Sequence, residues 1–305
     1  MEKTYPLVSI VTVNYNGLIY TRDFLKSLQK ISYSNVEIFV VDNASSQSIE
    51  PLKIEFPFVT FILSQVNLGF AGGNNLAIKQ AKGKYCLLLN NDTEVDPNFL
   101  EPLVDLMESN SNIGICSSKL LYFASPNILE FAGSKGVNLY TGRGFAIGHK
   151  EPDHEGLNRS YKTELAHGAA MMISMALIEK IGLMAELFFL YYEEVDFCER
   201  AKRAGFEIWY CGKSKVFHKE SMSVGKDSPM KIYYLTRNRI IFTRRNTSGL
   251  QKIAALLFFY FVSFPKWTLT YLLQGEFKLL KSFLKGSIWN LFHYHIFSNT
   301  GLIIR

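Results

Sequence analysis

Four clusters of polar residues each follow a short apolar run, and their residue types are those that bind ligands and catalyse reactions. The runs are rich in β-branched residues and resemble buried strands. In parallel sheets, ligands bind beyond the carboxyl ends of the strands. Polar clusters at four such ends therefore favour one shared site over four independent turns. The clusters occupy residues 14–16, 42–43, 67–75 and 90–92.

Two aspartates in these clusters are candidates for ligand contacts. Asp42 could accept hydrogen bonds from the base or ribose of a nucleotide, or it could cap the turn that follows it. Asp92 follows an apolar run and could hold Mg²⁺ or Mn²⁺, because these ions bind through one or two carboxylates plus the phosphates of a substrate. An ordinary Asx turn is the structural alternative at Asp92.

The segment NLGFAGGNN (67–75) places three glycines before a predicted helix. Backbone N–H groups in such a segment, together with a helix N-terminus, can cradle a phosphate. The segment does not match GxGxxG and lacks the lysine of a P-loop, so it does not indicate a dinucleotide site or a P-loop. A tight turn that requires glycine is the alternative.

Acidic residues crowd the start of a helix predicted from about residue 194 to 204, in YYEEVDFCER. Acids at a helix N-terminus oppose the helix dipole, and Asp196 with Arg200 forms an ordinary i,i+4 pair, so a structural role is available. The cluster follows the apolar run LFFLYY, however, and a carboxylate at the edge of such a wall suits a general base. A lone histidine such as His218 indicates a functional site only if the fold places other functional residues around it. The acids are Glu193, Glu194, Asp196 and Glu199.

The elements that must position these clusters alternate between strand and helix. This order is typical of a doubly wound, mostly parallel α/β sheet with helices on both faces. We expect Gly83 to be the C-cap of the helix that follows the Gly-rich segment. The predicted strands cover 7–13, 36–41, 58–63 and 85–89, a Gly-rich loop or hairpin covers 131–149, and a further helix covers about 176–182.

Composition limits the class of protein. The chain has 305 residues, of which 48% are hydrophobic and 20% charged, and this excludes a disordered, collagen-like or coiled-coil protein. Four scattered cysteines without a CxxC pair indicate neither a zinc ribbon nor a disulfide framework, which favours a reducing cytosol. The N-terminal segment lacks the features of a signal peptide.

The last 75 residues differ from the rest in charge. Residues 1–230 carry 22 Lys and Arg against 26 Asp and Glu, whereas residues 231–305 carry 11 against one. An apolar stretch over 253–273 is long enough to span a bilayer, but Pro265 and Lys266 lie in its middle. Beyond it, lysines alternate with Leu, Phe and Trp, as in helices of the membrane interface. Interfacial helices are favoured over a true span and over packing against the body or a second subunit. Bulky aliphatics between the lysines argue against nucleic acid.

Eight segments, in order, resemble the family 2 glycosyltransferases, in particular the bacterial group that includes rhamnosyltransferase-like enzymes. The resemblance covers about residues 6–245 and implies a GT-A fold. It further implies a catalytic domain over 1–230, with a nucleotide-sugar-binding half over about 1–98 and an acceptor half over about 99–230. A basic, aromatic, membrane-associated tail follows over 231–305. The segments are VSIVTVNYNG, VVDNAS, NLGFAGGNN, LLLNNDTEV, HGAAMMI, FLYYEEVDFCERAKRAGF, VFH and YYLTRNR.

The resemblance also implies roles for individual residues. Glu194 matches the catalytic base, while Asp92 and His218 match ligands of a divalent cation, Mn²⁺ or Mg²⁺. Two positions depart from the family pattern, because Asn90 stands at the first position of the metal motif and Glu194 stands where Asp is usual. Support of the acceptor or donor falls to His167, Glu193 and Asp196, and contacts with the nucleotide sugar fall to Tyr15, Asn16, Asp42, Asn67, Gly69, Gly73, Asn74, Asn90 and Asn91.

The implied function is an inverting sugar transfer in bacterial surface polysaccharide synthesis. The donor would be a dTDP- or UDP-sugar, with rhamnose the leading guess, and the acceptor a saccharide or a lipid-linked molecule. We expect a peripheral protein on the cytoplasmic face of the plasma membrane, without a nucleic-acid partner, and a homo-oligomer is one option. Two alternatives are another nucleotide-sugar enzyme, such as a nucleotidyltransferase, and a non-catalytic membrane-bound module that binds nucleotide sugars.

Overall fold

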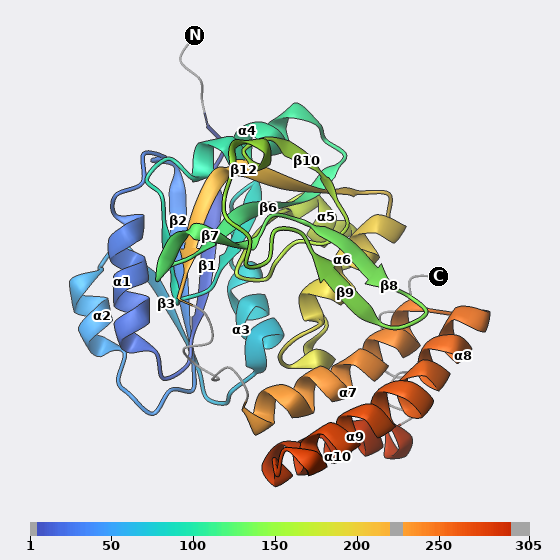
Figure 1. Cartoon of the computed structure of the whole chain (residues 1–305). Helices are drawn as coiled ribbons and strands as arrows, with labels where there is room; N and C mark the ends of the chain where they lie inside the picture. The colour runs from blue at the N-terminus through green and yellow to red at the C-terminus, as the bar shows by residue number, and fades with distance from the viewer. Residues whose placement is uncertain (1–4, 220–227, 294–305) are drawn as a thin grey trace.

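A computed structural model describes residues 5–219 and 228–293, and its centre is one mixed sheet flanked by helices (Figure 1). The strand order is β10-β12-β6-β11-β4-β1-β2-β3, with β5 paired to β12 and β7 to β6. Along β1 (Val8–Asn14), Val8 and Ile10 belong to one buried apolar cluster and Val11 to another, because alternate side chains face opposite sides of the sheet. The expected α/β class with flanking helices is confirmed.

The first part of the chain builds the parallel half of the sheet. Strand β1 pairs in parallel with β2 and with β4, and β2 pairs in parallel with β3. Their β-branched and leucine-rich sequences suit strands that are covered on both faces. After β1 come α1 (Leu18–Leu28), β2 (Val36–Asn43), α2 (Glu50–Glu55), β3 (Thr60–Ser64), α3 (Gly69–Ile78) and β4 (Tyr85–Leu89).

The second part adds antiparallel strands to the same sheet. Strand β11 lies between β4 and β6 and runs antiparallel to both, while β6 and β12 pair in parallel. The Gly-rich region contains the hairpin β8–β9, one of the two predicted options. The elements are β5 (Thr93–Val95), α4 (Leu100–Ser109), β6 (Ile113–Tyr122), β7 (Ser125–Phe131), β8 (Ser134–Asn138), β9 (Arg143–Ala146), η1 (Glu155–Leu157), β10 (Ser160–Thr163), β11 (Ala170–Ser174), α5 (Met175–Ile181), η2 (Glu186–Phe188), α6 (Glu193–Arg203) and β12 (Glu207–His218).

The strand register brings polar residues to one edge of the sheet. Asn14 lies opposite Asp42 in the parallel pair of β1 and β2. His218, the last residue of β12, lies opposite Thr93 in the antiparallel pair of β12 and β5. Because Asp92 directly precedes Thr93, this pairing places His218 next to the fourth polar cluster.

The C-terminal helices form a separate layer, in which α8, α9 and α10 lie beyond α7 (Figure 1, orange to red). Helix α10 packs on α7 through one buried stripe, and a Cβ at Gly286 would lie only 2.7 Å from the carbonyl oxygen of Tyr233. The stripe contains Phe283, Gly286, Ser287 and Asn290. The elements are α7 (Pro229–Asn246), α8 (Gly249–Leu257), the π-helical η3 (Phe258–Ser263), α9 (Phe264–Leu273) and α10 (Phe277–Phe292).

Within the described residues, one continuous helical stretch, Gly249–Leu273, is long and apolar enough to cross a membrane, and most of it is exposed. Pro265 has no N–H to donate to the carbonyl one turn earlier, which accounts for the π-helical segment just before it. The stretch therefore presents a broad apolar surface that the rest of the described chain leaves uncovered.

One predicted boundary is wrong. Helix α3 begins at Gly69, inside the Gly-rich segment, and ends at Ile78, with Lys79 as its C-cap in right-handed conformation. Gly83, the predicted C-cap, instead lies against β1, where its N–H donates to the Ser9 hydroxyl (2.9 Å). The glycine is needed for this close approach, since a Cβ there would lie 2.6 Å from the Ser9 backbone nitrogen.

Candidate active site

The carboxyl ends of β1, β2 and β4 meet in a hydrogen-bonded network centred on buried Asn14. Its Nδ2 donates to Asp42 Oδ1 (2.7 Å), and its Oδ1 accepts from the Thr21 hydroxyl (2.9 Å). Asn91 Nδ2 donates in turn to Thr21 Oγ1 (2.9 Å). Asp42 and Asn91, both predicted to contact the donor, are therefore held around a residue that the predicted site omits.

Tyr15 and Asn16 form the rim of this network. Tyr15 is 41% exposed, so its ring is accessible for stacking on a nucleotide base. Asn16 adopts a left-handed φ of 53°, and its Oδ1 accepts from the backbone N–H of Ser46 (2.8 Å). The Ser45 hydroxyl accepts from the Asn16 N–H (2.9 Å) and donates to Asp42 (2.6 Å). The rim is thus fixed to the carboxylate beneath it.

Side-chain amides fix the start of the Gly-rich segment. Asn43 Nδ2 donates to Asn67 Oδ1 (3.1 Å) and to the Gly69 carbonyl (3.0 Å), while Asn43 Oδ1 accepts from Leu68 N (2.9 Å). Asn67 Oδ1 also accepts from Gly69 N (2.9 Å). Asn74, which is buried, donates to the Phe70 carbonyl within the same helix (2.9 Å).

The glycines of this segment have packing roles. Gly69 has φ +70°, and a Cβ there would overlap the carbonyl oxygen of Phe189, which accepts from Phe70 N (2.6 Å). A Cβ at Gly73 would lie 3.0 Å from the Val13 side chain. Because protein acceptors already take the first two N–H groups of α3, the segment differs from the open phosphate cradle that the sequence suggests.

His218 lies between two carboxylates. Its Nε2 is 3.1 Å from Asp92 Oδ1, and its Nδ1 is 2.7 Å from Glu130 Oε2 at the end of β7. Burial lowers the pKa of His218, but the hydrogen bonds and charges of Asp92 and Glu130 together raise it to about 10. Asp92 and Glu130 therefore orient the imidazole and favour its protonated form, and a cation bound at Nε2 would replace the proton there. Glu130 is not among the residues predicted from the sequence.

These partners are suited to a divalent cation. Two adjacent ligands of an octahedral ion with bonds of about 2.1 Å lie about 3.0 Å apart, which matches the separation between Asp92 Oδ1 and His218 Nε2. A second carboxylate on the far imidazole nitrogen is the usual support of a metal-binding histidine. The described residues contain no complete cluster of three or more His, Cys, Asp or Glu for a metal. Asp92 and His218 would thus supply two ligands and leave the rest to a substrate.

The segment 167–169 connects this pair to the predicted base. The rings of His167 and His218 lie 6.2 Å apart, and burial lowers the pKa of His167, whose Nδ1 accepts from Ala169 N (3.1 Å). A Cβ at the next residue, Gly168, would lie 3.8 Å from the Cβ of Glu194. Neutral His167 therefore lies against His218, and its neighbour in sequence, Gly168, lies against Glu194.

Glu193 and Glu194 are carboxylates with unused hydrogen-bonding capacity. Oε2 of each is buried and accepts no hydrogen bond from the described part of the chain. Burial raises the pKa of Glu194, and burial together with the charge of Glu194 raises that of Glu193. A buried carboxylate oxygen without a protein partner needs a ligand or a proton, which is the property expected of a catalytic base.

The loop before α6 is strained. Phe189, Tyr191 and Tyr192 all have φ between 64° and 74°, a region that costs non-glycine residues about 1–3 kcal/mol each. Asn238 of α7, which is fully buried, holds the loop by donating from Nδ2 to three backbone carbonyls. The acceptors are Phe188, Leu190 and Tyr191, each at 2.8 Å.

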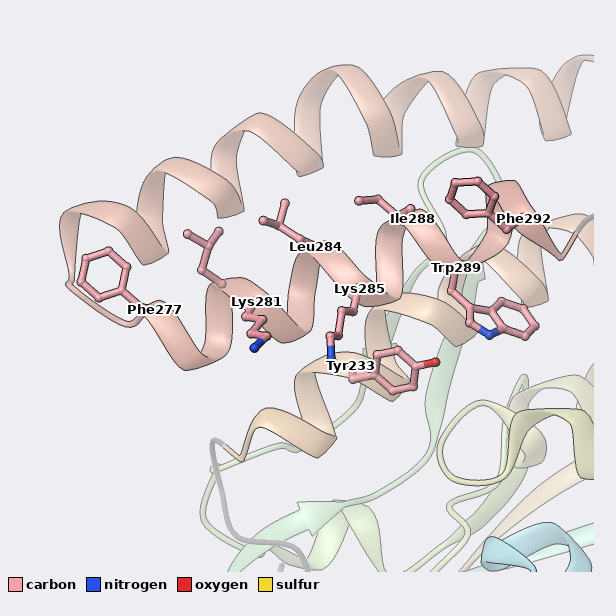
Figure 2. A pocket seen from close by; sticks show the side chains of 9 residues that line it. Tyr233, Phe277, Lys281, Leu284, Lys285, Ile288, Trp289 and Phe292 are labelled. Carbon is pink, nitrogen blue, oxygen red and sulfur yellow. The ribbon is translucent and has the colours of Figure 1, made fainter.

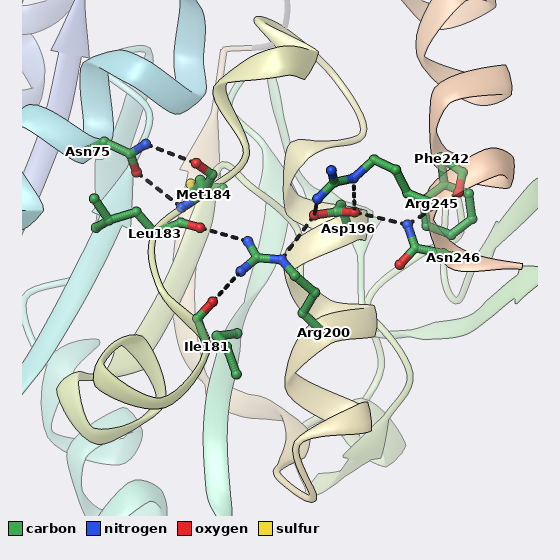
Figure 3. Close-up of polar contacts among 9 residues, drawn as sticks. All are labelled: Asn75, Ile181, Leu183, Met184, Asp196, Arg200, Phe242, Arg245 and Asn246. Carbon is green, nitrogen blue, oxygen red and sulfur yellow. Dashed lines mark hydrogen bonds and ion pairs between the residues drawn. The ribbon is translucent and has the colours of Figure 1, made fainter. Parts of the chain in front are cut away.

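Asp196 has a structural role instead of the predicted contact with a substrate. It accepts from Arg200 Nε of the same helix (3.0 Å) and from Arg245 Nε (3.0 Å) and Asn246 Nδ2 (2.9 Å) of α7, and the last two contacts tie α6 to α7 (Figure 3). Burial raises its pKa, but the two arginines outweigh burial and lower it overall. The boundary predicted at residue 230 therefore falls at the start of a helix that is bound to the catalytic body.

Comparison with known proteins gives a family and a fold. Residues 9–181 match the family described as Glycosyl transferase family 2. The chain is 30% identical over 240 residues to the low-salt glycan biosynthesis hexosyltransferase Agl10 of Haloferax volcanii, a match that covers 77% of this chain and 74% of Agl10.

Two solved structures are similar in fold. The mannosyltransferase PcManGT from Pyrobaculum calidifontis, in complex with GDP-Man and Mn²⁺, has a TM-score of 0.59 at 12% identity, over 95% of this chain and 88% of its own. GalNAc-T7 with UDP, GalNAc and Mn²⁺ has a TM-score of 0.59 at 15% identity, over 76% of this chain and 49% of its own. The chain thus spans about half the length of GalNAc-T7. Because the family match covers more than half of the chain, this protein belongs to glycosyl transferase family 2.

Proposed function

We propose that this glycosyltransferase transfers a sugar, with inversion, from a nucleoside diphosphate to a hydroxyl group of a saccharide or lipid-linked acceptor. Glu194 carries the proposal, because its Oε2 is buried without a partner among the described residues and its pKa is raised. It also lies beside Gly168, whose neighbour in sequence, His167, has its ring 6.2 Å from that of His218. A carboxylate with a raised pKa is a stronger base than one in water.

The donor would lie along the ends of β1, β2 and β4. Tyr15 would stack on the base, and Asp42 and Asn91 would position the nucleoside from the Asn14 network. Asp92 and His218 would hold Mn²⁺ or Mg²⁺ against the diphosphate, and the bound cation would offset the negative charge that develops on the leaving group. Asn90 has a neutral side chain, so the protein contributes a single carboxylate from residues 90–92.

The acceptor hydroxyl would attack the anomeric carbon on the face opposite the diphosphate. Its proton passes to Glu194 as the new C–O bond forms and the bond to the diphosphate breaks. One base and one displacement imply inversion at the anomeric carbon. Neutral His167, next to Gly168 in the chain, and buried Glu193, next to Glu194, would orient the sugar or the acceptor.

The proposed donor is a hexose or deoxyhexose nucleotide. The resemblance to rhamnosyltransferase-like enzymes supports a dTDP- or UDP-sugar, the similarity to Agl10 supports a hexose, and GDP-Man in PcManGT adds GDP-sugars. The exposed apolar helices and the basic tail support work at the cytoplasmic face of a membrane, where a lipid-linked acceptor is found.

A donor panel tests the proposal. UDP-, dTDP- and GDP-sugars are each incubated with the full-length protein and Mn²⁺, and release of nucleoside diphosphate and thermal shift are measured. We expect one donor class to stabilise the protein and to be turned over. Stabilisation without turnover for every donor would instead favour a binding module, and pyrophosphate release from nucleoside triphosphates would favour a nucleotidyltransferase.

A further inference from the structure

A groove of about 530 Å³ runs along α10 (Figure 2). None of the residues that line it belongs to the candidate active site. Its lining is apolar and aromatic except for two lysines, Lys281 and Lys285. The apolar part includes Phe277, Leu284, Ile288 and Trp289. A groove of this composition suits a ligand that combines a hydrocarbon chain with negative charge.

The two lysines can act on one group. They are four residues apart on α10, so they lie on the same side of the helix about one turn apart. Figure 2 shows both side chains extending from the same side of α10, with Lys285 next to Tyr233 of α7. Two ammonium groups on one side of the helix could both donate to the oxygens of one phosphate.

Neither lysine has an ion-pair partner in the part of the chain that the structure describes. Over the described ranges 5–219 and 228–293, no ion pair joins Lys281 or Lys285 to a carboxylate, whereas Lys202 and Lys219 of the body are each bound by two. Acidic side chains are also rare in this part of the sequence, because Glu276 is the only Asp or Glu after residue 230. The groove therefore carries a positive charge that an anionic ligand would satisfy.

The apolar lining is continuous with exposed apolar surface. Phe277 is 67% exposed and Ile288 43% exposed, and the neighbouring α9 exposes Leu269 and Leu273. A free phosphate would use the lysines but not this surface. A lipid would use both, because its chain could lie along Leu284 and Ile288 while its phosphate meets the lysines.

We propose that this groove binds one anionic lipid of the membrane, with its phosphate between Lys281 and Lys285 and its hydrocarbon chain along the apolar side chains of α10. The proposal rests on the proposed work of the enzyme at a membrane. It goes beyond general attraction of a basic tail to an anionic surface, because it assigns the lipid to two particular lysines. Bound there, the lipid would hold the layer of α8–α10 at the membrane.

The test measures flotation of the full-length protein with vesicles of phosphatidylcholine alone or with 30% phosphatidylglycerol. The double variant K281Q/K285Q is compared with K252Q/K278Q, which removes two other lysines of the same helical layer and the same net charge. We expect K281Q/K285Q to bind the anionic vesicles about 30-fold more weakly than K252Q/K278Q does, because only the first variant loses the two charge-assisted contacts with the lipid phosphate. Both variants lose the diffuse attraction of two lysines to the anionic surface, which the comparison between them cancels.

Each other outcome overturns the proposal in a different way. Equal weakening in both double variants would mean diffuse attraction without a groove site. Unchanged binding in K281Q/K285Q would remove the lysines from lipid binding while leaving membrane association intact. If the unaltered protein floats with neither vesicle, the membrane part of the proposed function fails as well. Light scattering on the vesicle-free protein gives a further check, since a dimer that K281Q/K285Q dissociates would assign the groove to a second copy.

Discussion

At the scale of single residues, His218 shows how a site is assembled from side chains that are each ordinary. The imidazole is fixed by Asp92 on one nitrogen and Glu130 on the other, at 3.1 and 2.7 Å. Either carboxylate alone would leave the ring free to rotate about its remaining bond. With both present, the edge formed by Asp92 Oδ1 and His218 Nε2 is preorganised, which is what a weakly coordinated substrate-bound cation requires.

Substitution of Glu130 by Gln should weaken binding of Mn²⁺ in the presence of nucleoside diphosphate by about tenfold or more, as loss of a supporting carboxylate usually does. Glutamine keeps the shape of the side chain but removes the charge that faces the imidazole. Titration of Mn²⁺ by electron paramagnetic resonance measures the affinity without any sugar transfer. Glu151→Gln, an exposed change on a neighbouring segment, is the control. Equal affinities in the two variants would contradict the role of Glu130.

Substitution of the proposed base, Glu194, should change the rate of transfer and not the binding of a ligand. Glu194→Gln should lower kcat by at least about 100-fold and leave binding of the donor intact, because glutamine cannot accept the proton of the acceptor. Rates are measured with saturating donor, and donor binding by thermal shift. Glu199→Gln, on the same helix and paired with Lys202 at the surface, is the matched control. Normal turnover in Glu194→Gln would remove this residue from catalysis.

The pH dependence of the same step has a definite sign. A base must be ionised to act, and burial raises the pKa of Glu194 above its ordinary value of 4.5. Activity should therefore fall as pH decreases through this raised pKa, and the loss should begin at a higher pH than for a solvated glutamate. A pH–rate profile of kcat with saturating donor measures the inflection. An inflection at or below 4.5 would contradict the raised pKa.

At the scale of elements, the loop between η2 and α6 is held in its strained conformation from outside. Its backbone accepts three hydrogen bonds from Asn238, and the Phe189 carbonyl accepts a fourth from Phe70 at the start of α3. The loop between η2 and α6 thus connects the Gly-rich segment, the start of α6 and helix α7. The strain stays at the residues that precede Glu193 and Glu194, which fixes where these carboxylates emerge.

Asn238→Ala should destabilise the protein by about 2–3 kcal/mol, since it removes three buried hydrogen bonds at about 1 kcal/mol each. It should also lower kcat more than it raises KM for the donor, because the loop positions the base and not the nucleotide. Urea unfolding measures the stability, and steady-state kinetics measure kcat and KM. Asn127→Ala, at an exposed position, is the control. A stable variant with unchanged kcat would show that the loop keeps its conformation without Asn238.

The sequence predicts the parallel strands of the fold better than it predicts the end of α3 or the residues that hold the site residues in place. The strands β1, β2 and β4 were evident because two-sided burial imposes β-branched and leucine-rich runs. The predicted C-cap at Gly83 is wrong because α3 lies earlier in the chain than expected, from Gly69 to Ile78. It begins in the glycines themselves, whose small size is required by Val13 and Phe189. Glu130 and Asn238 carried no local signal, since each acts only on residues brought to it by tertiary structure.

At the scale of the whole molecule, charge and apolar surface are separated from the catalytic edge. Residues 1–230 carry a slight excess of acidic residues, while residues 231–305 carry 11 Lys and Arg against one Glu, so the net positive charge of the chain comes from this last part. Its helices expose most of the large apolar side chains of α8–α10. A molecule built this way has one face suited to an anionic membrane and a body that such a surface does not attract.

This separation makes a prediction that the exposed side chains can test. Replacement of Phe261, Leu269 and Leu273 by serine removes apolar groups that are 75%, 56% and 79% exposed, so folding should be little affected. Each side chain would contribute about 1–2 kcal/mol when buried in a bilayer interface, so the triple variant should bind vesicles at least ~100-fold more weakly. Flotation with vesicles that contain 30% phosphatidylglycerol measures the loss.

The matched control uses apolar side chains that are equally exposed but lie on the body. Ile54, Phe58 and Leu63 are 81%, 51% and 50% exposed on and near α2 and β3. Serine at these three positions removes a similar apolar area, yet membrane binding should be unchanged because the body does not face the bilayer. If both triple variants lose binding equally, the protein adheres to lipid through hydrophobicity in general. If neither does, α8–α10 bury their apolar face elsewhere, and a partner protein or a second copy becomes the better occupant of that surface.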